Sequence, residues 1–315
     1  MSFGYLGEKI RAAPITERPF RHIDIPELFQ PRHLAEILRS PEVSTTPAAS
    51  DEALFPILFQ AGYRIVNFPG CVIDKDEYIA WRSDRGELGG RNNPSCEGFG
   101  VTLRLAEVET PIIADLLDYL DSGDFLDALA EKFGVNRSAT FLDAGVQKYL
   151  DGYEISPHPD VRRKALTYMV NINPAPGSDR LDHHTHYMRL KPEHRRVGSF
   201  WEANPHLDRC WVPWGWCETE KVQSANNSLV AFAPYDGSLH AVRAAYDHLA
   251  HQRTQLYGNL WFREATARSG PEWWEFGAEQ PPRDQCSAWR PSAPPAQDQP
   301  SFVVANRLDM RARRR

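Results

Sequence analysis

Two histidines and one aspartate are the residues of this sequence best suited to hold a catalytic metal ion. His158 and Asp160 form a His-x-Asp pair in YEISPHPDVRRKALTYMVNI, and His240 follows much later in SLHAV. Two imidazoles and one carboxylate on one face of Fe(II) leave open coordination positions for other ligands. The pattern therefore predicts a non-haem iron site. The alternative is a turn at SPHPD and a core histidine at position 240.

The surroundings of this pair carry more information than the pair itself, because a His-x-Asp sequence is common by chance. The β-type run KALTYMVNI follows the pair, an apolar run precedes His240, and Arg253 opens the run RTQLYGNLWF. A basic residue thus heads the run that follows His240.

In combination these residues resemble the Fe(II)/2-oxoglutarate-dependent oxygenases, specifically their prolyl-hydroxylase-like branch. The resemblance spans residues 19–263, although thirteen residues from His240 to Arg253 is longer than usual for that branch. It implies a mainly β fold with flanking helices and a double-stranded β-helix (jelly-roll) core. It also implies O₂ and 2-oxoglutarate as cosubstrates. The implied Fe(II) ligands are His158, Asp160 and His240, and the implied 2-oxoglutarate pocket contains Arg253, Tyr149, Thr167 and Tyr257. A guanidinium binds a carboxylate through two parallel hydrogen bonds, and we favour Arg253 over Arg243 for this role. At the head of a strand, Arg253 would project into the barrel, whereas Arg243 would lie almost against the metal.

The activity implied by the resemblance is hydroxylation of a C–H bond in a small molecule, such as a natural product, an amino-acid derivative or a sugar. Asp160 favours hydroxylation over halogenation, because halogenating relatives lack the carboxylate. Desaturation, epimerisation and cyclisation begin with the same hydrogen abstraction and remain alternatives. A non-catalytic cupin-like metal-binding or sensor protein is a further alternative, but it has no need of Arg253.

Two further motifs are candidates for the substrate pocket. The run LDHHTHYM contains His184 and His186, and a Trp-rich segment contains Trp201 and Trp211 together with Trp214 and Trp216. We predict that these side chains line the mouth of the site, where aromatic faces stack on rings or cations. The alternatives are a packed cap for the tryptophans, and a second metal site or plain surface for the histidines. The basic residues at 189–196 could bind an anionic group or be solvated.

Composition narrows the class of protein. The 315 residues carry 36 basic and 42 acidic side chains, a net charge of −6, and 9 tryptophans. This balance argues against nucleic acid as a partner, and no apolar run is long enough to span a membrane. Five cysteines without a CxxC pair indicate reduced thiols. We therefore expect a cytoplasmic enzyme with a small-molecule substrate, and the composition is compatible with a homodimer.

Three regions should position these residues. Residues 1–138 are expected to form a mixed helix and strand region that buttresses the core, with a helical pattern over 109–133 broken at Ser122-Gly123 and a charged loop at 76–92. Residues 139–280 should form the catalytic β core, with a Trp-rich insert at 183–220. Residues 281–315 read as a Pro-rich basic tail.

Overall fold

A computed structural model describes residues 3–67, 71, 74–84 and 98–264 of the chain. The expected Pro-rich tail at 281–315 and the final part of the expected core region, 265–280, lie outside the described residues. No helix of the described ranges is long and apolar enough to cross a bilayer.

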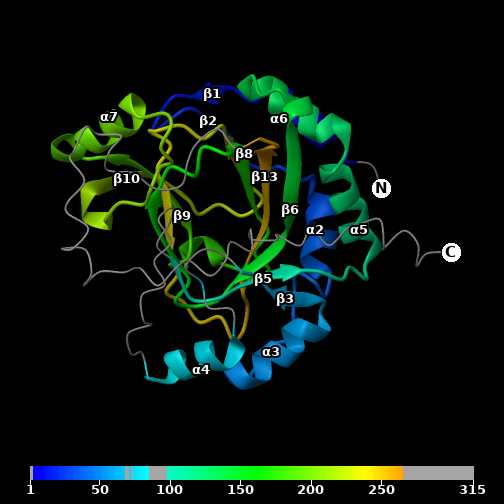
Figure 1. The fold of residues 1–315 in the computed structure, drawn as a ribbon. Helices are drawn as coiled ribbons and strands as arrows, with labels where there is room; N and C mark the ends of the chain where they lie inside the picture. The colour runs from blue at the N-terminus through cyan, green and yellow to red at the C-terminus, as the bar shows by residue number, and fades with distance from the viewer. Residues whose placement is uncertain (1–2, 68–70, 72–73, 85–97, 265–315) are drawn as a thin grey trace. The chain divides into compact units, whose positions relative to one another are not determined.

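Two antiparallel sheets form the core of the described chain (Figure 1). The larger sheet has the order β1 (Ile15–Thr16), β2 (His22–Ile25), β11 (Leu229–Phe232), β8 (Lys164–Asn171), β13 (Arg253–Phe262), β6 (Thr140–Tyr149), β5 (Thr102–Leu105) and β3 (Tyr63–Ile65). The smaller sheet has the order β10 (Cys217–Gln223), β9 (Thr185–Leu190), β12 (His240–Arg243), β7 (Glu154–His158) and β4 (Gly98–Phe99).

The eight strands from β6 to β13 have the connectivity of a jelly roll. Strands β6, β8, β11 and β13 lie in the larger sheet, and β7, β9, β10 and β12 lie in the smaller one. The chain thus passes back and forth between two sheets, as in a double-stranded β-helix. The predicted fold class is confirmed. The expected insert at 183–220 is shorter than predicted, because its two ends are the core strands β9 and β10.

The N-terminal elements buttress the larger sheet. Strands β2 and β5 pair with β11 and β6 and so extend the core at both edges. Helices α2, α5 and α6 lie beside β6 in Figure 1. One apolar cluster joins helical residues such as Leu126 to the outward-facing Leu166 and Leu256 of the sheet. The helices outside the jelly roll are α1 (Tyr5–Ala12), α2 (Pro31–Arg39), α3 (Asp51–Gln60), α4 (Lys75–Asp84), α5 (Pro111–Leu120) and α6 (Gly123–Phe133).

Helix α4 corrects the loop expected at 76–92. The Asp74 carboxylate accepts hydrogen bonds from the backbone N–H groups of Asp76 and Glu77 and so caps the first turn. Tyr78 anchors the helix because its ring is fully buried in the main apolar cluster. The expectation is therefore wrong for residues 76–84, and residues 85–92 lie outside the described part. The expected break at Ser122-Gly123 does separate α5 from α6.

Candidate active site

His158, Asp160 and His240 meet at one end of the jelly roll. His158 ends β7 and His240 begins β12, and the two residues are direct partners in the ladder between these strands. Asp160 follows two residues after His158. One ligand atom from each residue lies within 4.8 Å of the others, and all three residues are buried. The jelly roll thus brings together the three residues predicted to bind iron.

Backbone carbonyls orient both imidazole rings. Nδ1 of His158 lies 2.9 Å from the carbonyl oxygen of Ser156, and Nδ1 of His240 lies 3.1 Å from that of Ser238. A carbonyl can only accept, so each Nδ1 carries a proton, and Nε2 is the ring atom left to bind a metal. Burial, with His158 close by, lowers the pKa of His240 to about 3. This ring is therefore neutral at neutral pH.

Asp160 is held by contacts to both its backbone and its carboxylate. Its φ of 60° is left-handed, and Nη1 of Arg209 donates to the carbonyls of Pro159 and Asp160, at 3.2 Å each. Its Oδ2 accepts from the Thr167 hydroxyl at 2.8 Å, and its Oδ1 accepts from Nζ of Lys164 at 2.6 Å. Burial opposes ionisation of Asp160, but Lys164 and the two imidazoles hold its pKa well below the ordinary value.

Arg253 is a buried cation with an unused donor. Its guanidinium lies 4.4 Å from the centre of the Tyr149 ring, and Nη2 donates to the Thr185 hydroxyl at 3.0 Å. Nη1 is buried and has no hydrogen-bond partner. Among the described residues, no carboxylate forms a salt bridge with Arg253. Because a buried charge is costly unless it is paired, this site favours an anionic ligand.

A single cavity connects the metal-binding group to Arg253. Its lining includes His158, His240, Arg253, Tyr149 and Tyr257. The predicted pocket residues Tyr149 and Tyr257 therefore face the same space as Arg253 and the two imidazoles.

Thr167 has a different place from the one predicted. It is absent from this lining, and its hydroxyl contacts Asp160 and the Asn259 side chain instead. It orients a predicted metal ligand rather than facing the cosubstrate pocket.

Arg243 lies on the outer face of the smaller sheet. Its side chain is half exposed, pairs with Glu154 at 2.8 Å and lies 4.6 Å from the centre of the Trp214 ring. The expectation that Arg243 would lie almost against the metal is wrong. Side chains alternate along a strand, so His240 and Val242 face the cavity while Arg243 points away from it.

The nine-residue connection 244–252 explains the long spacing between His240 and Arg253. The Tyr246 hydroxyl accepts from the backbone N–H of Arg253 at 2.7 Å and donates to the Tyr149 carbonyl at 2.5 Å. The Nε2 atom of His248 lies 2.7 Å from Oδ1 of Asp51, and this contact ties the same connection to helix α3. The extra residues thus fix the position at which β13 begins.

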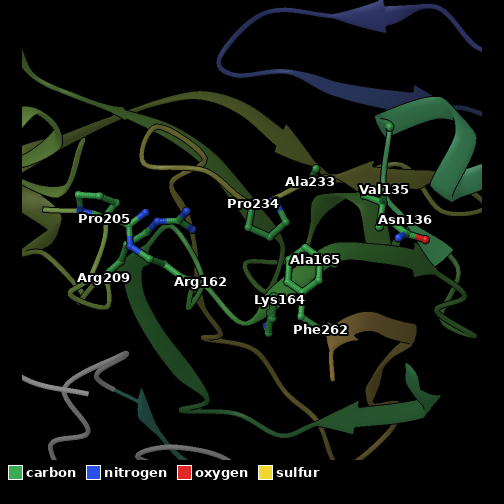
Figure 2. A pocket seen from close by; sticks show the side chains of 11 residues that line it. Val135, Asn136, Arg162, Lys164, Ala165, Pro205, Arg209, Ala233, Pro234 and Phe262 are labelled. Carbon is green, nitrogen blue, oxygen red and sulfur yellow. The ribbon is translucent and has the colours of Figure 1, made fainter. Parts of the chain in front are cut away.

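A larger cavity of about 440 Å³ adjoins the site (Figure 2). Lys164 lines this cavity as well as the smaller one, and thus contacts both the cavity and Asp160. Arg162 and Arg209 contribute further positive charge, and Pro205 and Phe262 contribute apolar surface. Sequence patterns did not single out Lys164 or Arg209.

The predicted substrate residues lie outside both cavities. Trp201 is buried against Met188 and Val212 on the outer side of the smaller sheet, as in the packed-cap alternative. His186 lies 3.1 Å from the Thr219 hydroxyl. His184 is buried beside His183, with ring centres 4.4 Å apart. Trp211 is half-buried and lines neither cavity.

The histidine cluster at 183–186 and the basic stretch at 189–196 lie outside the metal-binding group. Within the described ranges, the three residues at the jelly-roll end are the only group of three or more metal-ligating side chains, so the second histidine cluster forms no such site. In the basic stretch, Arg189 pairs with Glu218 and Glu220 at the surface. The Trp-rich segment reaches the larger cavity through Pro205 and Arg209 instead of through its tryptophans.

Comparison with known proteins gives a structural likeness only. No family model matches the sequence, and no curated protein matches it. The fold is similar to an oxidoreductase of the 2OG-Fe(II) oxygenase family from Burkholderia pseudomallei, at 13% identity and a TM-score of 0.34, over 85% of this chain and 94% of that chain.

Two other solved structures are also similar. A prolyl hydroxylase from Trichoplax adhaerens, in complex with a hypoxia inducible factor peptide fragment, matches at 10% identity and a TM-score of 0.44, over 82% of this chain and 90% of that one. HygX from Streptomyces hygroscopicus, with nickel, 2-oxoglutarate and hygromycin B bound, matches at 10% identity and a TM-score of 0.28, over 66% and 86%. These scores are too low to assign a function, which we argue from the strand order and the site residues.

Proposed function

We propose that this protein is an Fe(II)- and 2-oxoglutarate-dependent dioxygenase that hydroxylates a C–H bond of a small molecule. One observation carries the proposal: the cavity that exposes the imidazoles of His158 and His240 also contains the buried, unpaired Nη1 of Arg253. A metal-binding protein without a cosubstrate has no use for this second feature. A 2-oxo acid with a distal carboxylate uses both.

The residues present fit the two ligands. The Nε2 atoms of His158 and His240 and the Asp160 carboxylate would hold Fe(II), a ligand set suited to this metal. Arg253 would pair with the distal carboxylate of 2-oxoglutarate, which supplies the anion that its buried guanidinium lacks. When bound, iron and 2-oxoglutarate supply the oxidation of the substrate with O₂, with succinate and CO₂ as co-products.

The chain itself contributes the orientation of the ligand groups. The carbonyls of Ser156 and Ser238 keep the imidazole rings in one tautomer and one orientation. Thr167 fixes one oxygen of Asp160. Thr185 and the Tyr149 ring hold Arg253 in place before the cosubstrate arrives. This preorganisation reduces the entropy lost when the cosubstrate binds.

The test is release of succinate from 2-oxoglutarate by the full chain with Fe(II) and O₂, with and without candidate substrates. We expect Fe(II)-dependent turnover that is lost in His158→Ala and Asp160→Ala. Gln60→Glu, an exposed change on α3, is the matched control and should turn over normally. Absence of iron-dependent turnover in the wild-type protein, coupled or uncoupled, would contradict the proposal.

A further inference from the structure

We infer that the 440 Å³ cavity binds the substrate through an anionic group, and that Lys164 is the residue that receives this group. The inference rests on the proposed function, because it assigns the substrate class of the same site. The group is a carboxylate or a phosphate, which share the charge and the acceptor oxygens that an ammonium group recognises.

Lys164 lies between the metal-binding group and the larger cavity. Its Nζ donates to Asp160 at 2.6 Å and to the Tyr257 hydroxyl at 3.0 Å, and its side chain lines both cavities. A metal cation bound by Asp160 would repel this ammonium group and compete with it for the carboxylate. The larger cavity is the neighbouring space into which the displaced charge would point.

A β-bulge places Lys164 inside the barrel. In the ladder between β8 and β13, Leu166 pairs with Leu260 and Lys164 pairs with Trp261, so Ala165 is an extra residue. Strict alternation from Leu166, which faces the helices, would turn Lys164 to the same outer side. Bulges commonly redirect a side chain beside a functional site.

Three cationic side chains line the larger cavity. Arg162 and Arg209 both line it, and both pair with Asp236, at 3.3 Å and 2.7 Å. The Asp208 carboxylate also lies beside them and accepts from the backbone N–H groups of Arg162 and Arg209, at 2.8 Å and 2.9 Å. Two carboxylates thus balance the two guanidinium groups. Lys164 adds a third cation, and its partner Asp160 is needed for the metal. A protein of net charge −6 concentrates positive charge at this point.

The cosubstrate does not remove this excess. Fe(II) with the Asp160 carboxylate and Arg253 carry two positive charges in total, which the two carboxylates of 2-oxoglutarate neutralise. Lys164 remains uncompensated, because Asp236 and Asp208 already balance Arg162 and Arg209.

Lys164 is the cation able to contact the ligand directly. Arg162 donates to the carbonyls of Leu207 and Trp201, and Arg209 donates to those of Pro159 and Asp160, so these guanidinium groups are fixed by the chain. They place fixed positive groups on the wall of the cavity, whose described lining contains no carboxylate. The ammonium of Lys164 carries three donors on a flexible stem and can turn from Asp160 to a ligand. The apolar surface of Phe262 and Pro234 would cover the uncharged part of the molecule.

The experiment measures binding of four probes of similar size to the full chain loaded with Zn(II) and saturated with 2-oxoglutarate. Benzoate and phenyl phosphate are anionic, benzyl alcohol is neutral and benzylamine is cationic. Calorimetric or NMR titration gives each dissociation constant without turnover. We expect the anions to bind at least about tenfold more tightly than the other two probes, with weaker binding at high salt. The tighter of the two anions distinguishes a carboxylate from a phosphate substrate.

Two variants locate the binding. Lys164→Met removes the ammonium group. Asn136→Asp adds a negative charge at the cavity lining while its side-chain oxygen can still cap Ser138. Both variants should weaken the binding of the two anions at least about fivefold and leave the binding of benzyl alcohol unchanged. Gln60→Glu, which adds the same charge on α3 outside the cavity lining, should change nothing. Circular dichroism checks that each variant is folded, and Asn136→Asp keeps the test valid if Lys164→Met does not fold.

The outcomes separate this inference from the proposed function. Equal binding of the neutral and anionic probes, or anion binding that Asn136→Asp leaves intact, overturns the inference. Loss of anion binding in Arg253→Met but not in Asn136→Asp overturns it too, because the probes would then occupy the cosubstrate pocket. Iron-dependent succinate release in a protein that fails these tests leaves the proposed function standing. Anion binding without any such turnover removes the proposed function alone.

Discussion

Replacement of Arg253 by methionine tests the central feature of the site. Methionine removes the guanidinium group but keeps an unbranched apolar side chain that still fits beside the Tyr149 ring. The change should weaken binding of 2-oxoglutarate strongly. It should leave the affinity for the metal nearly unchanged, because the guanidinium group contacts Thr185 and Tyr149, which are not predicted metal ligands.

The size of the effect follows from the donors of Arg253. Nη1 is buried without a partner, and Nη2 already donates to Thr185. A guanidinium fork can make two hydrogen bonds to a carboxylate, each worth about 1.5–3 kcal/mol when the partners are charged. Since every 1.4 kcal/mol is a tenfold change in affinity, the full loss would be about 10²–10⁴-fold. The existing bond to Thr185 favours the lower half of this range.

The assay is calorimetric titration of 2-oxoglutarate into protein loaded with Ni(II), without turnover. Arg243→Met is the matched control, because Arg243 pairs with Glu154 on the outer face and should bind 2-oxoglutarate within about twofold of wild type. Arg253→Lys should be intermediate, since an ammonium keeps the charge but loses the fork.

Thermal stability gives a second, independent readout. Removal of a buried charge that has no carboxylate partner should leave the melting temperature of the ligand-free protein unchanged or raise it. Unchanged 2-oxoglutarate affinity in Arg253→Met, or loss of affinity in Arg243→Met instead, would refute the assignment. A large fall in melting temperature would mean that the guanidinium group serves the fold.

Three further predictions concern other parts of the structure. Thr167→Val should weaken Zn(II) binding about 10–100-fold in a chelator competition, because the hydroxyl that holds Asp160 is lost. Burial lowers the pKa of Lys148 from 10.5 to about 7, so the unfolded chain binds more protons than the folded one between these values. The free energy of unfolding should therefore increase with pH across this window, and Lys148→Met should flatten that increase when it is measured by urea unfolding. Gly258→Ala should lower the free energy of unfolding by about 1–3 kcal/mol, because the new Cβ would come within 2.2 Å of the Tyr168 ring.

The jelly-roll class follows from the resemblance of the site motifs to a known family, and the strand order confirms it. The β-type runs near His158 and His240 are visible in the sequence, and the structure has His158 at the end of β7 and His240 at the start of β12. Period-2 alternation also placed Tyr257 on the same face as Arg253, and both line one cavity. These features depend on local patterns, which a single sequence contains.

The remaining features depend on contacts between distant segments. Lys164 reaches the interior only because Ala165 breaks the alternation of β8, and no residue type announces such a bulge. Aromatic composition alone does not say which face of a sheet a segment covers, and Trp201 turned out to pack on the outer face. Helix α4 is a different case, because its capping residue Asp74 is of a type that often begins a helix, although the charged residues after it favour a loop.

Strand β13 lies between β6 and β8 in the larger sheet, and this position affects folding during synthesis. This strand pairs with β6 on one side and β8 on the other, although it is the last strand of the jelly roll to leave the ribosome. Until residues 253–262 emerge, β6 and β8 each present an open edge to the cell, and such edges invite pairing with other chains. Strand β2 likewise cannot pair with the core until β11 has been synthesised. Folding should therefore be slow and largely post-translational, with the cosubstrate-binding arginine arriving on the strand that closes the sheet.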